Sequence, residues 1–283
     1  MSRRRTVLIA VGVLGLAVAG VVVTLNLLDA APVRAERCTA VSNGTRSDLT
    51  PSQADNAALI AAIAVRRDLP ARAATVGIAT ALQESKLANV THGDRDSIGL
   101  FQQRPSQGWG TPAQLGDPVY ATNAFYDVLI RIAGYQGLPI TDAAQKVQRS
   151  GFPGAYAQHE AAARAWASAL TGNSPASVTC TLHAGGSGSG AAVAARVTRD
   201  YGTLPISTAA DGTLTVDAAA LRSGDAAEGT LLAWSFAQWA VAVASDLDLD
   251  SVATADQTWT RSGVTWAPSD RMPTGKVRLT LAH

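Results

Sequence analysis

This sequence of 283 residues lacks an excess of charge of either sign, because its 23 lysines and arginines are balanced by 22 aspartates and glutamates. This balance provides no electrostatic attraction for nucleic acid, so we expect no nucleic-acid partner. Only residues 1–37 are distinctly basic, with five arginines against two acidic residues.

Motifs for metals and cofactors are also lacking. None of the four histidines has metal-ligand spacing, and two cysteines are too few for a zinc cluster. Asp246, Asp248 and Asp250 are spaced like the start of a calcium loop. However, Ser251 and Gln257 occupy the positions where such a loop needs Gly and Glu. No serine lies in a nucleophile elbow and no glycine-rich turn is placed to hold phosphate, so we expect no metal and no cofactor.

Long apolar runs are absent except near the N-terminus, where residues 6–28 form an uncharged apolar run of 23 residues. About 20 apolar residues span a bilayer core, whereas the apolar part of a secretory signal is about 7–15 residues long. Arg3, Arg4 and Arg5 precede the run, so the positive-inside rule directs the rest of the chain out of the cytoplasm. We predict a single-pass membrane anchor with the bulk of the chain extracytoplasmic. The alternative is a signal peptide cleaved near residues 33–35, which releases a secreted protein.

Cysteine occurs only at Cys38 and Cys180. Outside the cytoplasm an even number of cysteines favours a disulfide, and these two bracket one segment of the chain. The sequence therefore predicts a Cys38–Cys180 bond that ties the ends of this segment together, and the alternative is two unpaired thiols.

Capping and turn signals divide the chain into parts. Residues 38–182 are predicted to form a mainly α domain, with helices at about 51–67, 70–87, 118–134, from Thr141 and at 154–170, and with no period-two alternation between 50 and 172. Residues 183–192 are rich in Gly and Ser, which predicts a flexible linker. Residues 193–283 combine strand-like alternation with an amphipathic helix at 229–247, which predicts a small α+β domain.

One carboxylate stands apart from the charged surface, Glu84 in the stretch "TALQESKLANV". The helical run before it, residues 73–83, carries no charge and is apolar on most sides, so Glu84 is expected in the last turn of a buried helix. There the helix dipole and the limited hydration both favour the protonated carboxyl. General-acid cleavage of a glycosidic bond requires such a group, and the alternative is an ordinary surface glutamate at a helix end.

The residues that follow Glu84-Ser85 strengthen the catalytic interpretation. Gly99, Gln102 and Pro105 come 15, 18 and 21 positions after Glu84. In residue type and spacing this pattern resembles the soluble lytic transglycosylase branch of the lysozyme-like superfamily, over about residues 45–172. In that family a Glu-Ser pair ends a buried helix, and a Gly-Leu-Met-Gln-like turn forms the wall of the sugar cleft.

The likeness is weaker downstream. The family's Tyr-Asn-Ala-Gly segment has no close counterpart, and "VQRSGFPGAY" at residues 147–156 lies in its place. Gln148 and Tyr156 are the nearest functional equivalents in this stretch. Residues 96–98, Asp-Ser-Ile, also depart from the small residues that usually precede the glycine.

The resemblance implies cleavage of the β-1,4 bond between N-acetylmuramic acid and N-acetylglucosamine in peptidoglycan, with Glu84 as the single acid/base. The expected substrate-binding residues are Ser97, Gln102, Gln103, Arg104, Gln148 and Tyr156. Trp109 and Tyr120 are candidates either for stacking on sugar faces or for the core. A hydrolase of the same fold needs a second carboxylate, for which Asp94 and Asp96 are the candidates. Their loop is equally typical of solvated Asp–Arg pairs.

Residues 193–283 loosely resemble small domains that accompany actinobacterial cell-wall hydrolases. Only three of the 23 basic residues are lysines, a composition that fits such a source. We expect this part to bind the wall or to act as a spacer. The competing hypothesis for the whole chain is a catalytically inactive wall-binding or scaffold protein.

Overall fold

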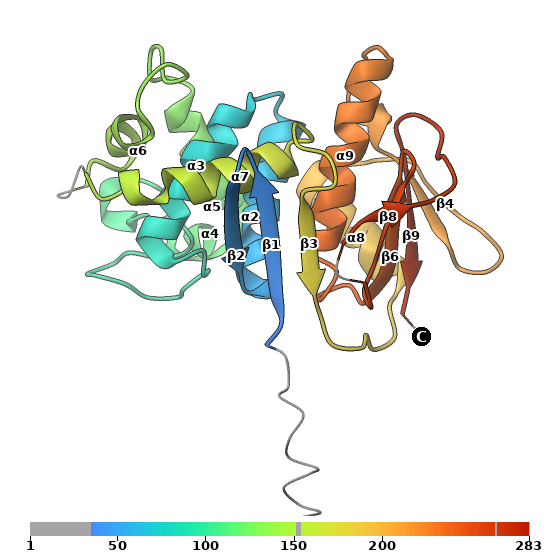
Figure 1. Ribbon diagram of the computed structural model, residues 1–283. Coiled ribbons are helices and arrows are strands. Elements are labelled where there is room, and N and C mark those ends of the chain that lie inside the picture. Colours follow the sequence, from blue (N-terminus) through green and yellow to red (C-terminus); the bar gives the residue numbers. More distant parts are fainter. Residues whose placement is uncertain (1–34, 151–153, 264, 283) are drawn as a thin grey trace, which may run out of the picture. The chain divides into compact units, whose positions relative to one another are not determined.

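The computed structural model describes residues 35–150, 154–263 and 265–282 (Figure 1). Glu36–His283 forms one compact unit. Its described residues have a mixed α+β fold with eight α-helices and two antiparallel sheets, which confirms the expected combination of helices and sheet. The predicted anchor, residues 6–28, lies outside the described residues, and no helix within them is long and apolar enough to cross a membrane.

A three-stranded sheet joins the two ends of the first half of the unit, residues 37–181. β1 (Arg37–Ser42) pairs on one side with β2 (Thr45–Leu49) and on the other with β3 (Val178–Thr181). Cys38 and Cys180 are direct partners in the β1–β3 register and form the predicted disulfide. The bond confirms that prediction and suggests an extracytoplasmic domain. The strands themselves were not predicted, because they are short and mostly polar.

Helices fill the chain between these strands. Five of them correspond to predicted helices: α2 (Pro51–Arg66), α3 (Ala71–Ser85), α5 (Pro118–Leu129), α6 (Ile140–Gln148) and α7 (Glu160–Leu170). α4 (Pro112–Gly116) is a short addition. The start of α2 follows from its capping box, since Thr50 Oγ1 accepts from the Gln53 amide while the Gln53 side chain accepts from the Thr50 amide.

The second half of the unit, residues 190–281, is built on a six-stranded antiparallel sheet. Its order is β4 (Ile206–Thr208), β5 (Leu214–Asp217), β9 (Lys276–Leu281), β6 (Leu249–Thr254), β7 (Gln257–Thr260) and β8 (Ala267–Pro268). β7 and β8 pair antiparallel, with Gln257 opposite Pro268 and Thr258 opposite Ala267. The predicted helix is present as α9 (Ala226–Ala242), but it is not amphipathic, because every residue from Leu232 to Ala242 is buried.

The stretch expected to be a flexible linker packs against this half. Residues 183–189 have no regular secondary structure, and α8 (Gly190–Tyr201) begins inside the expected linker. The Gly188 amide donates to the Ala282 carbonyl at 3.0 Å, and the Gly186 amide donates to Asp248 Oδ1 at 2.9 Å. Gly and Ser are typical of flexible chains, but they also allow close packing of backbone, and here they do the latter.

Gln238 on α9 joins the two halves, and Figure 1 shows α9 beside β3. Its Oε1 accepts from the backbone amides of Ser177 and Val178, at 2.8 and 2.9 Å. Its Nε2 donates to the Ala169 carbonyl at 2.6 Å and to a second carbonyl at 3.0 Å. These four bonds satisfy a fully buried amide side chain. Trp266 Nε1 adds a bond to the Val178 carbonyl at 2.8 Å.

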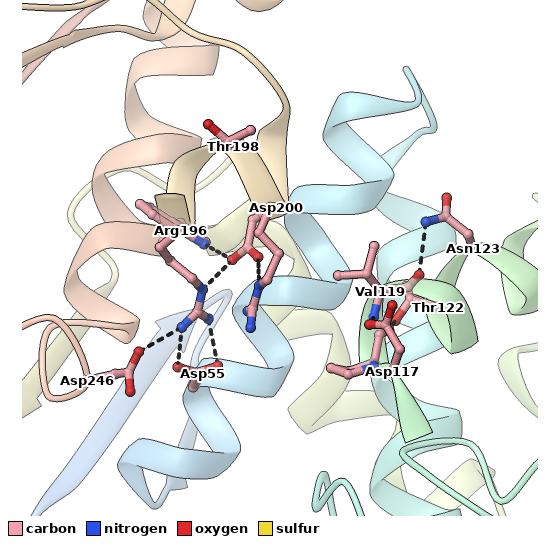
Figure 2. Close-up of polar contacts among 12 residues, drawn as sticks. Asp55, Asp117, Val119, Thr122, Asn123, Arg196, Thr198, Asp200 and Asp246 are labelled. Atoms are coloured by element: carbon pink, nitrogen blue, oxygen red, sulfur yellow. Dashed lines mark hydrogen bonds and ion pairs between the residues drawn. The ribbon is translucent and has the colours of Figure 1, made fainter. Parts of the chain in front are cut away.

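An ion cluster around Arg196 makes a second junction between the halves (Figure 2). The guanidinium of Arg196 on α8 is bonded to Asp55 on α2, to Asp200 and to Asp246, at distances between 2.7 and 3.0 Å. Asp200 is fully buried and also accepts from Trp239 Nε1 at 2.8 Å. Burial opposes the charge of Arg196, but the bonds to Asp55 and Asp200 hold the pKa of its guanidinium above the ordinary value. Arg196 therefore remains charged.

Candidate functional site

The site begins with Glu84, which is half-buried in the last turn of α3. The phenolic hydroxyl of Tyr156 donates to Glu84 Oε1 at 2.7 Å. Tyr156 is itself fully buried. Burial and then the bond to the Glu84 carboxylate raise the pKa of the Tyr156 phenol, so that the phenol remains a protonated donor. Two residues singled out from the sequence are thus in direct contact.

The backbone that follows Glu84-Ser85 turns sharply. Lys86 and Leu87 both have positive φ angles, 55° and 58°, and their amides bond back to the last turn of α3. The Lys86 carbonyl accepts from Gln53 Nε2 at 2.9 Å, and the Leu87 carbonyl accepts from Asn56 Nδ2 at 2.8 Å. Side chains of α2 therefore hold the end of the helix that carries Glu84.

A tight turn over residues 98–103 forms the neighbouring wall. Ser85 Oγ donates to the Leu100 carbonyl at 2.7 Å, which fastens the Glu-Ser pair to the turn. Ile98 and Gln103 pair across the turn through backbone bonds of 2.9 and 3.1 Å. Gly99 has φ 79°, and a Cβ there would lie 2.4 Å from the Leu115 carbonyl oxygen, so only glycine fits this position.

The predicted binding residues occupy different environments around this turn. Gln148 Nε2 donates to the Phe101 carbonyl at 2.7 Å, which brings α6 to the turn. Gln102 is half-buried, with Nε2 bonded to the Gly99 carbonyl at 3.3 Å. Gln103 is only 1% exposed, and its Nε2 donates to the Ala121 carbonyl in the core. Gln103 therefore supports the turn from inside.

Ser97 and Arg104 also serve the loop itself. Ser97 is buried, and its amide donates to the Asp94 carbonyl at 3.1 Å. Arg104 Nε donates to Asp96 Oδ1 at 2.7 Å. These contacts favour a role in shaping the loop beside Glu84.

The two candidate second carboxylates lie in the solvated Asp–Arg arrangement. Asp96 accepts from Arg104 Nε and from the amide and hydroxyl of Ser106, at 2.7, 2.8 and 3.0 Å. The bond from Arg104, followed by those from Ser106, lowers the pKa of Asp96 well below its ordinary value. The Asp94 side chain is 93% exposed and lies 4.0 Å from Arg95 Nε. Both contacts are typical of a structured surface loop.

Asp96 gives this loop a defined pH dependence. Its folded-state pKa is below the value of about 3.9 for an unfolded aspartate, so the carboxylate stabilises the loop above about pH 4 and loses this effect as the pH falls further. We expect Asp96→Asn to increase hydrogen exchange in peptides covering residues 94–106 at neutral pH. The wild-type loop should exchange faster only in acid, once intrinsic rates are corrected for pH. Asp94→Asn is the matched control and should behave like wild type, whereas an unchanged loop in Asp96→Asn contradicts the assignment.

A cavity of about 470 Å³ is lined by Trp109, Gln148 and Arg149 together with Val128 and Val147. Neither Glu84 nor Tyr156 lines it, and its connection to the turn is Gln148, whose Nε2 donates to the Phe101 carbonyl. A flat indole beside amide and guanidinium donors suits a sugar ring and its polar substituents. The Tyr120 hydroxyl donates to the Trp109 carbonyl at 3.2 Å. Tyr120 therefore supports the backbone at Trp109, which itself lines the cavity.

Several residues that hold the site were not predicted. Gln53 and Asn56 cap the end of α3, and nothing in their local sequence indicates this role. Gln83 Oε1 accepts from Gln158 Nε2 and lies 3.1 Å from His159 Nε2. Burial lowers the pKa of His159, which favours the neutral ring there. All these contacts join segments far apart in the chain, so only the folded structure reveals them.

No protein-family model matches this chain, and no curated protein matches it. Among the residues that the structure describes, no group of three or more His, Cys, Asp and Glu side chains is arranged to hold a metal ion. The structure brings together a half-buried carboxylate, Glu84, a buried phenol bonded to it, Tyr156, and an amide-rich turn fastened to the same helix end.

Proposed function

We propose that the protein cleaves peptidoglycan strands between N-acetylmuramic acid and N-acetylglucosamine, as a lytic transglycosylase of lysozyme-like fold. The observation that carries the proposal is the 2.7 Å bond from Tyr156 to Glu84 at the end of α3. It joins the carboxylate singled out by the Glu-Ser spacing to the phenol singled out in the downstream stretch. The Gly-Leu-Phe-Gln turn lies against the same helix end, as the resemblance implies.

In this mechanism Glu84 acts first as an acid and then as a base. Because Oε1 accepts from Tyr156, the proton for the substrate is carried by Oε2. Its transfer to the glycosidic oxygen breaks the bond to C1 of the muramyl residue through an oxocarbenium-like transition state. The Glu84 carboxylate then takes the proton of the muramyl C6 hydroxyl, whose oxygen attacks C1 and closes an anhydro ring. The role of Tyr156 is to orient the carboxylate.

The contacts of the other carboxylates favour this route over hydrolysis. A hydrolase needs a second carboxylate about 5–9.5 Å from the first, as nucleophile or as base for water. Asp96 is already bonded to Arg104 and Ser106, and Asp94 extends into solvent. Intramolecular attack by the substrate's own hydroxyl needs neither of them.

The location of the substrate agrees with the remaining features. Peptidoglycan lies outside the cytoplasm, where a disulfide such as Cys38–Cys180 persists. We propose that residues 6–28 anchor the chain in the membrane and that Glu36–His283 faces the wall. Residues 193–282 would then lie next to the wall as part of the same unit.

Product analysis tests the reaction type. We expect purified full-length protein to release muropeptides with anhydromuramyl ends, about 18 Da lighter than hydrolysed ends because one water is not added. Mass spectrometry of digested peptidoglycan distinguishes the two. Reducing muramic ends alone would identify a hydrolase. Sedimentation of the protein with peptidoglycan, without any release over long incubation, would identify a wall-binding or scaffold protein instead.

A further inference from the structure

We propose that Asn56 and the Arg196 cluster are positioning elements for Glu84, so that the second half of the unit is a working part of the catalytic site. The proposal rests on the proposed function, because it concerns the same carboxylate. It follows from two sets of contacts on neighbouring residues of α2.

The first set holds the end of α3. Lys86 and Leu87, directly after Glu84-Ser85, lie in the left-handed region, which side chains with a Cβ adopt only where the surroundings fix it. The fixing contacts come from α2, since Gln53 Nε2 and Asn56 Nδ2 donate to the Lys86 and Leu87 carbonyls at 2.9 and 2.8 Å. These bonds set the direction in which α3 ends and hence the position of the Glu84 carboxylate.

The second set holds the same turn of α2 from the other half of the unit. Asp55 lies between Gln53 and Asn56 in sequence and, at about 100° per residue, projects about 160° away from Gln53 and about 100° away from Asn56. Both terminal nitrogens of Arg196 donate hydrogen bonds to the Asp55 carboxylate, at 2.7 and 3.0 Å (Figure 2). This forked pair fixes orientation as well as distance.

The cluster cannot form without the second half. Arg196 is only 8% exposed, and its other carboxylate partners, Asp200 and Asp246, both lie beyond residue 189. The first turns of α2 are therefore clamped between Arg196 on one side and the end of α3 on the other. A shift at Arg196 passes through Asp55 to Asn56 and reaches the backbone next to Glu84.

Conservative variants separate this role from simple support of the fold. Arg196→Lys keeps the charge but loses the fork, and Asn56→Ala removes the donor to Leu87. We expect each to lower kcat for peptidoglycan cleavage about 10-fold with KM changed less than twofold, because small misplacements of a catalytic group are costly. The peptide that contains Lys86 and Leu87 should also exchange its amide hydrogens faster.

Arg222→Lys provides the matched control. Arg222 belongs to the second half and pairs with Asp68, just beyond the other end of α2, and with Glu228 on α9. We expect it to change neither kcat nor exchange at residues 86–87. If Asn56→Ala fails to fold, Asn56→Asp keeps the size of the side chain while removing the donor, and it should show the same two effects.

The exchange measurement does not depend on activity, so the two proposals can fail separately. If wild type and Glu84→Gln are both inactive, the proposed function fails. Hydrogen exchange at residues 86–87 still shows whether Asn56 and Arg196 hold the backbone next to Glu84. Unchanged exchange in both Asn56→Ala and Arg196→Lys overturns the inference. Altered exchange with wild-type kcat overturns it too, because the contacts would then be structural only.

Discussion

Replacing Glu84 with glutamine should lower kcat for release of muropeptides by about 10²–10⁴-fold, the usual contribution of a general acid. Glutamine keeps the shape of the side chain and still accepts the hydrogen bond from the Tyr156 hydroxyl, so the fold should be preserved. It cannot donate a proton to the glycosidic oxygen or take one from the muramyl hydroxyl. Chromatography of soluble products from purified peptidoglycan measures the effect.

Glu160→Gln is a suitable control for this experiment. Glu160 begins α7 in the same half of the unit and forms ion pairs with Arg72 and Arg164. It should retain near-wild-type turnover with unchanged thermal unfolding. Should Glu84→Gln digest peptidoglycan as fast as wild type, the assignment of Glu84 as acid/base is wrong, whatever the products are.

The second large effect is expected from removal of the disulfide. Cys38 and Cys180 are 142 positions apart in sequence, so the bond excludes many conformations of the unfolded chain. We expect the double variant Cys38→Ala, Cys180→Ala to lose about 2–5 kcal/mol of unfolding free energy. Urea unfolding of the oxidised wild type and of the variant measures the difference. Equal midpoints and slopes would show that the backbone pairing of β1 with β3 suffices by itself.

The reduced wild type serves as an independent check. Both disulfide-bonded cysteines are almost fully buried, so the bond should resist mild reductant while the protein is folded and break once it unfolds. Reduced protein should then unfold at the same urea concentration as the double variant. A different midpoint would mean that the alanine substitutions disturb packing on their own.

Local signals in the sequence were sufficient for much of the first half. The Thr50–Gln53 capping box marks the start of α2, and the uncharged run before Glu84 identifies α3 as buried. The disulfide followed from the parity and spacing of two cysteines. Each of these features is decided by residues close together in the chain or by a simple count.

Features that depend on distant partners were missed. β1 pairs with β2 through a turn at Asn43-Gly44, which is a local hairpin signal. Its pairing with β3, some 140 positions later, is not indicated by any local pattern. The start of α8 was hidden in a Gly/Ser stretch whose composition is also typical of linkers. α9 looked amphipathic, but it has partners on every side.

The same limit applies to the candidate site. Glu84 was identified from its own helix, whereas Tyr156 came only from a resemblance that was weak at that point. Gln103 offered amide groups that suit a sugar, yet its side chain is buried against α5. Whether a polar side chain faces a cleft or the core depends on which elements pack against its own, and the local sequence does not show this.

Val178 lies in β3, an edge strand of its sheet, and this matters for any attempt to produce the two halves of the chain separately. The unpaired N–H and C=O groups of an edge strand can pair with a strand of another molecule, so proteins usually cover or interrupt such edges. Here the protection is a glutamine and a tryptophan from the other half, which occupy the outward amide and carbonyl of Val178. A chain cut within residues 183–189 would uncover this edge together with the buried face of α9. Self-association of the fragments would then be a property of the cut and not of the protein.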